Sequence, residues 1–132
     1  MEFKKLLSYF NNELIIIVGL GIYVIKGDML YLGPWVGEHA TEHVEIPIGR
    51  GICGSAAKTG KIEIVSNVHA DKRYLSCFIS TKSEIVIPIK YENIVVGEID
   101  IDSDEEDAFT KQYALFLENI ADMLGPHIHK LQ

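Results

Sequence analysis

The two cysteines of the chain, Cys53 and Cys77, are its candidates for redox chemistry. Cys53 lies in a glycine-rich turn just before a short predicted helix, where backbone N–H groups and the helix dipole favour a thiolate. Cys77 lies in a long polar loop over 66–83, where the charges of Lys72, Arg73 and Lys82 favour a thiolate as well. The thiolate is the nucleophilic form, so both positions are candidate reactive thiols. The alternative is that both are inert, buried side chains.

Acidic side chains gather on one face of the predicted sheet. The predicted strand over 94–102 places Glu98, Asp100 and Asp102 on the same side, because side chains alternate along a strand. A neighbouring predicted strand adds Glu84 to this set. Carboxylates that face one another repel, and a cationic ligand or a raised carboxyl pKa would relieve that repulsion. The alternative is an ordinary sheet face exposed to water.

Two short motifs match known site patterns without the structural context that those sites need. Residues 49–54 fit the glycine pattern of dinucleotide-binding sites, but the helix predicted after them is too short to connect parallel strands. His39 and His43 fit a metallopeptidase spacing that requires a helix, whereas this segment leads into a predicted strand. We therefore expect no cofactor and no bound metal.

The apolar periodicity predicts an α+β fold with a mainly antiparallel sheet. Helices are predicted at the two ends, over 3–10 and 104–124, with Gly125 and Pro126 breaking or kinking the second, and a short helix is predicted over 55–59. About six strands are predicted, over 15–25, 29–32, 43–48, 61–65, 83–89 and 94–102. We expect the terminal helices to cover one sheet face and the loops over 33–41 and 66–83 to form a pocket on the other.

The composition indicates one globular domain over residues 1–132. Hydrophobic residues make up 48% of the chain and charged residues 23%, and the net charge is −7. An acidic chain binds the phosphate backbone poorly, so nucleic acid is not an expected partner. The apolar run over 14–25 is too short to span a bilayer and Glu13 interrupts a signal-peptide pattern, so we expect no membrane association. These features predict a cytoplasmic protein.

The order of motifs along the chain resembles that of GAF domains. The segments that carry the resemblance are GICGSAAKTG at 51–60, VSNV at 65–68, SEIVIPI at 83–89, VGEIDIDS at 96–103 and AF at 108–109. Together they cover roughly residues 19–124, which is nearly the whole chain. The resemblance implies a GAF-like central antiparallel sheet, with helices on one face and a small-molecule pocket on the other.

Among GAF domains, the chain is most similar to the free methionine-(R)-sulfoxide reductases, which reduce a free amino acid. This resemblance implies that the following residues form the site: the redox cysteines Cys77 and Cys53, the substrate carboxylates Glu84, Asp100 and Asp102, and the pocket aromatic Tyr23. Two family features are missing, namely a third cysteine near Thr41 and a pocket tryptophan near Gly19. Trp35 is the residue that could reach the space of that tryptophan.

The implied reaction needs a thiolate that attacks the sulfoxide and an acid that protonates the departing oxygen. The attacking cysteine becomes a sulfenic acid, with which a second thiol condenses to a disulfide. The helix start favours Cys53 as nucleophile, whereas the family position of the loop cysteine favours Cys77; we take Cys77 as nucleophile and Cys53 as resolving thiol. A crowded carboxyl such as Asp100 or Glu84 would hold the proton, and the others would bind the ammonium of a free amino-acid-like molecule. A thioredoxin-like reductant would restore the thiols.

Two other classes of function fit the same fold. One is a non-catalytic GAF sensor that binds a small molecule, and the other is an adaptor with a vestigial pocket. Buried acids argue against an adaptor, which has no use for them. A homodimer is expected, because the helix predicted over 104–124 carries more apolar residues than one sheet face needs.

Overall fold

The computed structural model describes residues 17–37, 44–75 and 81–132 of the chain. The helix predicted over 3–10 and the loop cysteine Cys77 lie outside these residues. Within them, no helix is both long enough and apolar enough to cross a membrane.

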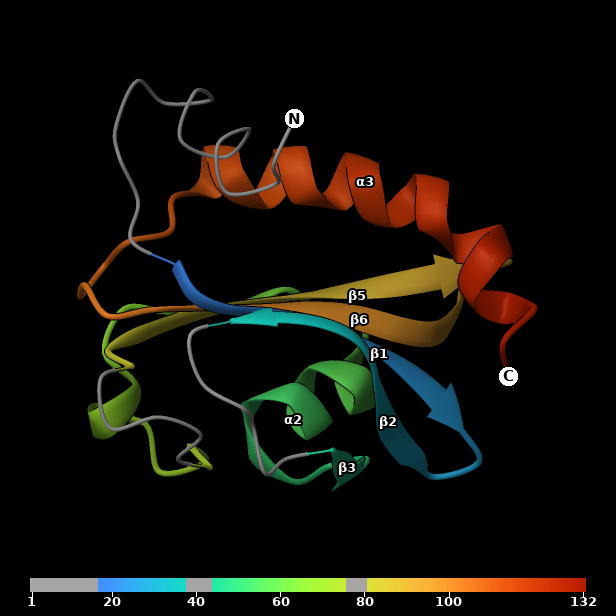
Figure 1. Ribbon diagram of the computed structural model, residues 1–132, viewed down its shortest axis with the longest axis horizontal. Helices are drawn as coiled ribbons and strands as arrows, with labels where there is room; N and C mark the ends of the chain where they lie inside the picture. The colour runs from blue at the N-terminus through green and yellow to red at the C-terminus, as the bar shows by residue number, and fades with distance from the viewer. Residues whose placement is uncertain (1–16, 38–43, 76–80) are drawn as a thin grey trace.

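A single six-stranded sheet forms the centre of the molecule (Figure 1). Its strands follow the order β3-β2-β1-β6-β5-β4, and each neighbouring pair is antiparallel. The bounds are β1 Ile17–Lys26, β2 Met29–Gly37, β3 Glu45–Pro47, β4 Glu63–Val65, β5 Ser83–Tyr91 and β6 Ile94–Ser103. The prediction of an antiparallel α+β fold with about six strands is confirmed.

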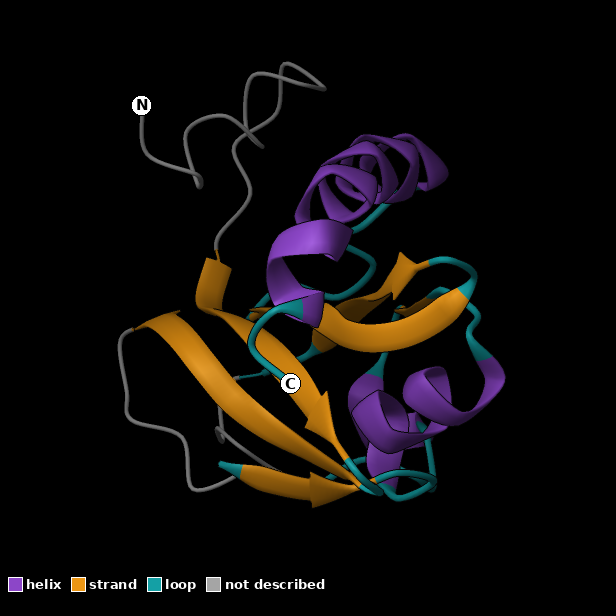
Figure 2. Cartoon of the chain, turned by 90° about the vertical axis from the view of Figure 1, so that its right-hand side faces the viewer, coloured by secondary structure: helices purple, strands orange, loops and turns teal. Residues whose placement is uncertain are grey.

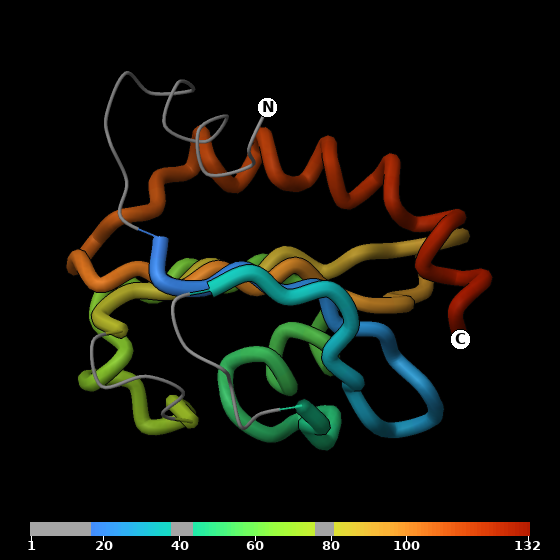
Figure 3. Tube along the Cα trace, in the orientation of Figure 1, coloured from blue at the N-terminus to red at the C-terminus, as the bar shows by residue number. Residues whose placement is uncertain are grey.

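Helices lie on opposite faces of this sheet. The long helix α3, Lys111–His129, covers one face, and the shorter helix α2, Gly51–Thr59, lies against the other (Figures 2 and 3). A 3-10 turn, η1 at Val68–Ala70, follows β4. The face under α2 is therefore covered by a helix as well as by loops, where the sequence predicted long loops and a helix of only 55–59.

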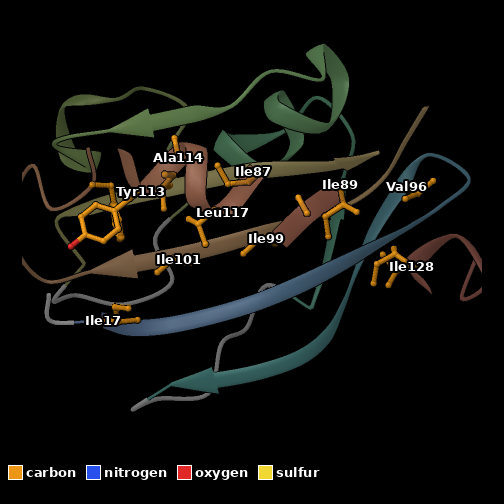
Figure 4. Close-up of a cluster of buried hydrophobic side chains, with 14 residues drawn as sticks. Ile17, Ile87, Ile89, Val96, Ile99, Ile101, Tyr113, Ala114, Leu117 and Ile128 are labelled. Carbon is orange, nitrogen blue, oxygen red and sulfur yellow. The ribbon is translucent and has the colours of Figure 1, made fainter. Parts of the chain in front are cut away.

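The alternation of side chains in β5 and β6 divides the buried residues into two groups. Isoleucines at every second position point toward α3 and pack on its apolar stripe (Figure 4). The residues labelled in that view are Ile17, Ile87, Ile89, Val96, Ile99, Ile101, Tyr113, Ala114, Leu117 and Ile128. The intervening positions of the same strands must face α2, and these are the positions that carry the acids.

Helix α3 begins and ends later than predicted. Thr110 caps it by accepting a hydrogen bond from the Tyr113 N–H, so the acidic residues over 104–107 precede the helix and do not form its first turn. The helix continues through Gly125 and Pro126 to His129. Gly125 lies directly on the Lys90 carbonyl, where a Cβ would overlap that oxygen. Pro126 is exposed, so water can reach the carbonyl that loses its helical partner.

Strand β2 also extends further than predicted, through residues that the sequence indicated as loop. Gly33 and Pro34 fall where the β1–β2 register shifts, between the pairs Tyr23–Leu32 and Gly21–Trp35. The unpaired positions at such an irregularity tolerate a proline, which cannot donate to the ladder. The strand therefore resumes after them and brings Trp35 beside β1.

Candidate functional site

Strands β5 and β6 place the predicted carboxylates on the face that α2 covers. Glu84 is paired with Asp102, and Val86 with Asp100, across the two strands. Strand β1 extends this face, because Gly21 is paired with Asp100 and Tyr23 with Glu98. Directly paired residues of an antiparallel sheet point to the same side, so these residues from three strands face one space.

A small pocket opens between this face and helix α2. Its empty space is about 270 Å³, counting the part open to solvent. The lining residues are Tyr23, Ile46, Ile52, Cys53, Leu75, Glu84 and Asp100. The structure thus brings four of the predicted site residues together, and Asp102 lies behind them, beside Glu84.

The Cys53 thiol lies among these carboxylates. Its sulfur is 3.9 Å from Oε2 of Glu84. The sulfur, one oxygen of Glu84 and one oxygen of Asp100 all lie within 4.8 Å of one another. All three residues are buried, so the chemistry of this thiol is determined by its acidic neighbours more than by water.

Cys53 differs from its prediction in position and in charge state. It is the third residue of α2 and does not precede the helix. Burial raises the pKa of its thiol well above the usual value, and the charges of four carboxyl groups raise it further, in the order Asp100, Glu98, Glu84 and Asp102. The prediction of a thiolate favoured by a helix start is therefore wrong, because desolvation and like charge outweigh the helix dipole.

Two carboxyl groups on this face hold their protons more strongly than free acids do. Burial raises the pKa of Glu98 well above its usual range, and the charge of Asp100 adds to the effect, while an interaction with the Cys53 thiol acts in the opposite direction. Burial and Asp100 likewise raise the pKa of Asp102, against a lowering contact with Glu84. The acid predicted from the sequence to hold a proton is Asp100 or Glu84, whereas the structure gives the raised pKa to their neighbours Glu98 and Asp102.

Glu98 is a residue of this face to which the sequence analysis gave no role in binding or catalysis. Its side chain is fully buried, and no N–H or O–H group of the described residues donates to either carboxylate oxygen. The alternation along the predicted strand had already placed it on the face of Asp100 and Asp102. The signal that marks it is therefore this period of two, combined with the absence of any basic residue near it in the sequence.

Trp35 lies on the same face of the sheet but outside the pocket lining. Its ring covers two glycines: a Cβ on Gly21 would come within 2.8 Å of the Trp35 Cε3, and a Cβ on Gly37 within 2.9 Å of its Cζ2. Gly21 is paired with Asp100, so the indole covers the sheet next to the carboxylates. The absence of side chains at these glycines provides the space for the ring.

An ion-pair cluster forms around Arg73, two residues before Leu75. Arg73 contacts Oε1 of Glu63 at 2.8 Å and Oδ2 of Asp71 at 2.7 Å. These contacts raise the pKa of Arg73 and lower that of Asp71. Leu75 follows directly and lines the pocket. Cys77 itself, together with His39, Thr41 and His43, lies outside the described residues, so the predicted approach of the two cysteines stays a prediction.

The fold and the motifs can be compared with known proteins. The family model of the GAF domain matches residues 13–128. The chain belongs to the GAF domain family. The matched residues include all six strands and α2, so this GAF domain contains the whole candidate site.

Several relatives of this GAF domain carry the name free methionine-R-sulfoxide reductase. The Escherichia coli protein of that name is 35% identical over 107 residues, which are 76% of this chain and 64% of that protein. The chain therefore spans somewhat less than two thirds of the length of that relative.

Two solved structures give the same comparison in three dimensions. The type II free methionine-R-sulfoxide reductase from Thermoplasma acidophilum superposes with a TM-score of 0.86 at 38% identity, covering 96% of this chain and 87% of that one. The free methionine-R-sulfoxide reductase from Neisseria meningitidis, in complex with its substrate, gives a TM-score of 0.79 at 31% identity, covering 86% of this chain and 68% of that one.

Proposed function

We propose that this GAF domain reduces free methionine-(R)-sulfoxide with its cysteine thiols. The observation that carries the proposal is the convergence of the Cys53 thiol with the carboxylates of Glu84 and Asp100 in one buried pocket. The reductases to which the chain is similar support the identity of the substrate. A sensor pocket would need acids for an amino group, but it would not need a thiol among them.

Each of the two cysteines carries out one step of the reduction. The thiolate of Cys77 attacks the sulfoxide sulfur and takes up the oxygen, which yields free methionine and a sulfenic acid on Cys77. The thiol of Cys53 then condenses with that sulfenic acid, forming the disulfide and releasing water. A thioredoxin-like dithiol returns both cysteines to thiols. The raised pKa of Cys53 favours this order, because a buried protonated thiol is a poor first nucleophile.

The pocket side chains would bind the substrate and supply the proton. The ammonium group would bind the carboxylates of Glu84 and Asp100, and the carboxyl of Asp102 behind them would hold a proton for the departing oxygen. Tyr23 in the lining and Trp35 over Gly21 would pack against the apolar part of the substrate. Trp35 would thereby replace the tryptophan that the family has near Gly19.

The test is turnover of free methionine-R-sulfoxide with dithiothreitol, comparing the wild type with three variants. Cys77→Ser should abolish reduction. Cys53→Ser should still give a single turnover and should accumulate sulfenic acid, which a dimedone probe detects. Glu84→Gln should raise KM more than it lowers kcat, because it removes a charge that binds the substrate. An inactive wild type that still binds methionine would instead favour the sensor.

We further propose the setting in which this activity occurs. Residues 1–132 would act as a single domain in the cytoplasm, where reducing conditions keep thiols available. Two copies would pair through α3, whose outer side exposes Leu115 and Met123 at 62% and 74%. Sedimentation should show a dimer at micromolar concentration, and a monomer would refute only this pairing.

A further inference from the structure

We propose that the reduced pocket also binds one thiophilic divalent cation, such as Zn²⁺, through Cys53, Glu84 and Asp100, with the buried carboxyl of Glu98 beside them. The ligand atoms would be the Cys53 sulfur and one carboxylate oxygen each from Glu84 and Asp100. The proposal does not rest on the reductase activity, but the site uses part of the same pocket. The cation and the ammonium group of the substrate would therefore exclude one another.

The first support is the geometry of three ligand atoms around one cavity. Tetrahedral Zn²⁺ with bonds of about 2.3 Å to sulfur and 2.0 Å to oxygen places those two ligands roughly 3.5 Å apart. The sulfur of Cys53 is 3.9 Å from Oε2 of Glu84, so a movement of a few tenths of an ångström is enough. All three residues line the same pocket, which leaves space for an ion between them.

The second support is the unpartnered carboxyl of Glu98. Its side chain is 0% exposed, no N–H or O–H group of the described residues donates to either oxygen, and the Cys53 thiol is the one group that lowers its pKa. It lies close enough to Cys53 and Asp100 for both to affect its pKa. A buried carboxyl without a cationic partner is costly, and no basic side chain of the described residues acts on the pKa of Glu98. A cation held by the other three residues would provide the missing partner.

The chemistry of the donors indicates which cation fits. A thiolate selects borderline and soft ions such as Zn²⁺ and Co²⁺ over Mg²⁺ and Ca²⁺, which prefer oxygen donors alone. Binding must release the proton of the Cys53 thiol, so affinity should rise with pH. A bound ion would also hold the sulfur of Cys53 away from any disulfide, which makes occupancy a reversible block on turnover.

Titration with Co²⁺ tests the site without reference to activity. The reduced, chelator-treated protein should bind a single Co²⁺ and develop the near-ultraviolet charge-transfer band of a cobalt thiolate, and Zn²⁺ should remove this band. Cys53→Ser should lose the band and Cys77→Ser should keep it. Glu98→Gln should weaken Co²⁺ binding by about tenfold or more, since even an indirect partner of a ligand contributes that much. Glu118→Gln, an exposed acid on α3, is the matched control and should bind as the wild type does.

The outcomes separate this proposal from the proposed function. Free methionine should raise the apparent Kd for Co²⁺, because its ammonium group needs the same carboxylates. The cation site is refuted if no thiolate band forms, if Cys53→Ser keeps the band, or if Glu98→Gln binds like Glu118→Gln. Circular dichroism of each variant ensures that a lost band reflects a lost ligand in a folded protein. Turnover of the metal-free protein is measured separately, so either proposal can fail while the other holds.

Discussion

Replacing Glu98 by glutamine should make the protein progressively more stable than the wild type as the pH rises. The structure buries this carboxyl completely, and its pKa is raised above that of the unfolded chain. The folded protein therefore binds a proton that the unfolded chain has released. The contribution of Glu98 to the free energy of unfolding is fully present below the unfolded pKa of about 4.3. It is lost as the pH rises from there through the folded pKa.

The size of the effect follows from the number of protons involved. One proton held by the folded state alone lowers the free energy of unfolding by about 1.4 kcal/mol for each pH unit. Glu98 and Asp102 both have raised pKa values, so together they give the wild type about twice that slope. Glu98→Gln removes one of the two protons and keeps nearly the same shape. The difference between the two proteins should grow by about 1.4 kcal/mol per pH unit for as long as Glu98 stays protonated in the fold.

Urea unfolding of the metal-free, reduced protein at a series of pH values above 4.5 measures this difference. Glu118→Gln serves as the control, because an exposed acid should leave the slope unchanged. Parallel curves for the wild type and Glu98→Gln would refute the reasoning. So would a Glu98→Gln protein that loses stability faster than the wild type as the pH rises.

Three further predictions concern the packing around the site. Gly125→Ala should lose about 1–3 kcal/mol of stability in urea unfolding, because its Cβ would overlap the Lys90 carbonyl. The control Asn119→Ala, at an exposed position of α3, should not lose stability in this way. Equal stability of the two variants would contradict the close packing of α3 on β5. Gly21→Ala should displace the indole of Trp35, the single tryptophan, and shift its fluorescence, and an unchanged spectrum would show that the ring does not cover Gly21. Arg73→Gln should change the free energy of unfolding by less than about 1 kcal/mol, since the ion pairs of Arg73 are partly exposed; a larger loss would mean that they hold the loop in place.

Alternation of side chains was enough to predict the sheet and the face that carries the acids. The isoleucines of β5 and β6 and the carboxylates between them follow a period of two, which the sequence displays directly. The same period placed Glu98 beside Asp100. Its full burial depends on α2, whose packing on that face is a tertiary contact without a local signal.

The charge state of Cys53 shows why the rest could not be predicted. Its neighbours in the sequence indicate a helix start, and a helix start alone favours a thiolate. The opposite result comes from acids 31 and more residues away in the chain, which the fold brings to the thiol. The end of α3 was missed for a related reason: Gly125 and Pro126 usually end a helix, but here the close approach to Lys90 needs a glycine and the proline is exposed.

Reduction of racemic free methionine sulfoxide tests the central claim most directly. The purified protein is incubated with the racemate and excess dithiothreitol, and the methionine formed and each remaining epimer are followed by chiral chromatography. We predict that the R epimer is consumed completely while the S epimer remains, and that Cys77→Ser forms no methionine. Consumption of both epimers at equal rates, or methionine formation by the wild type no faster than with dithiothreitol alone, would contradict the account.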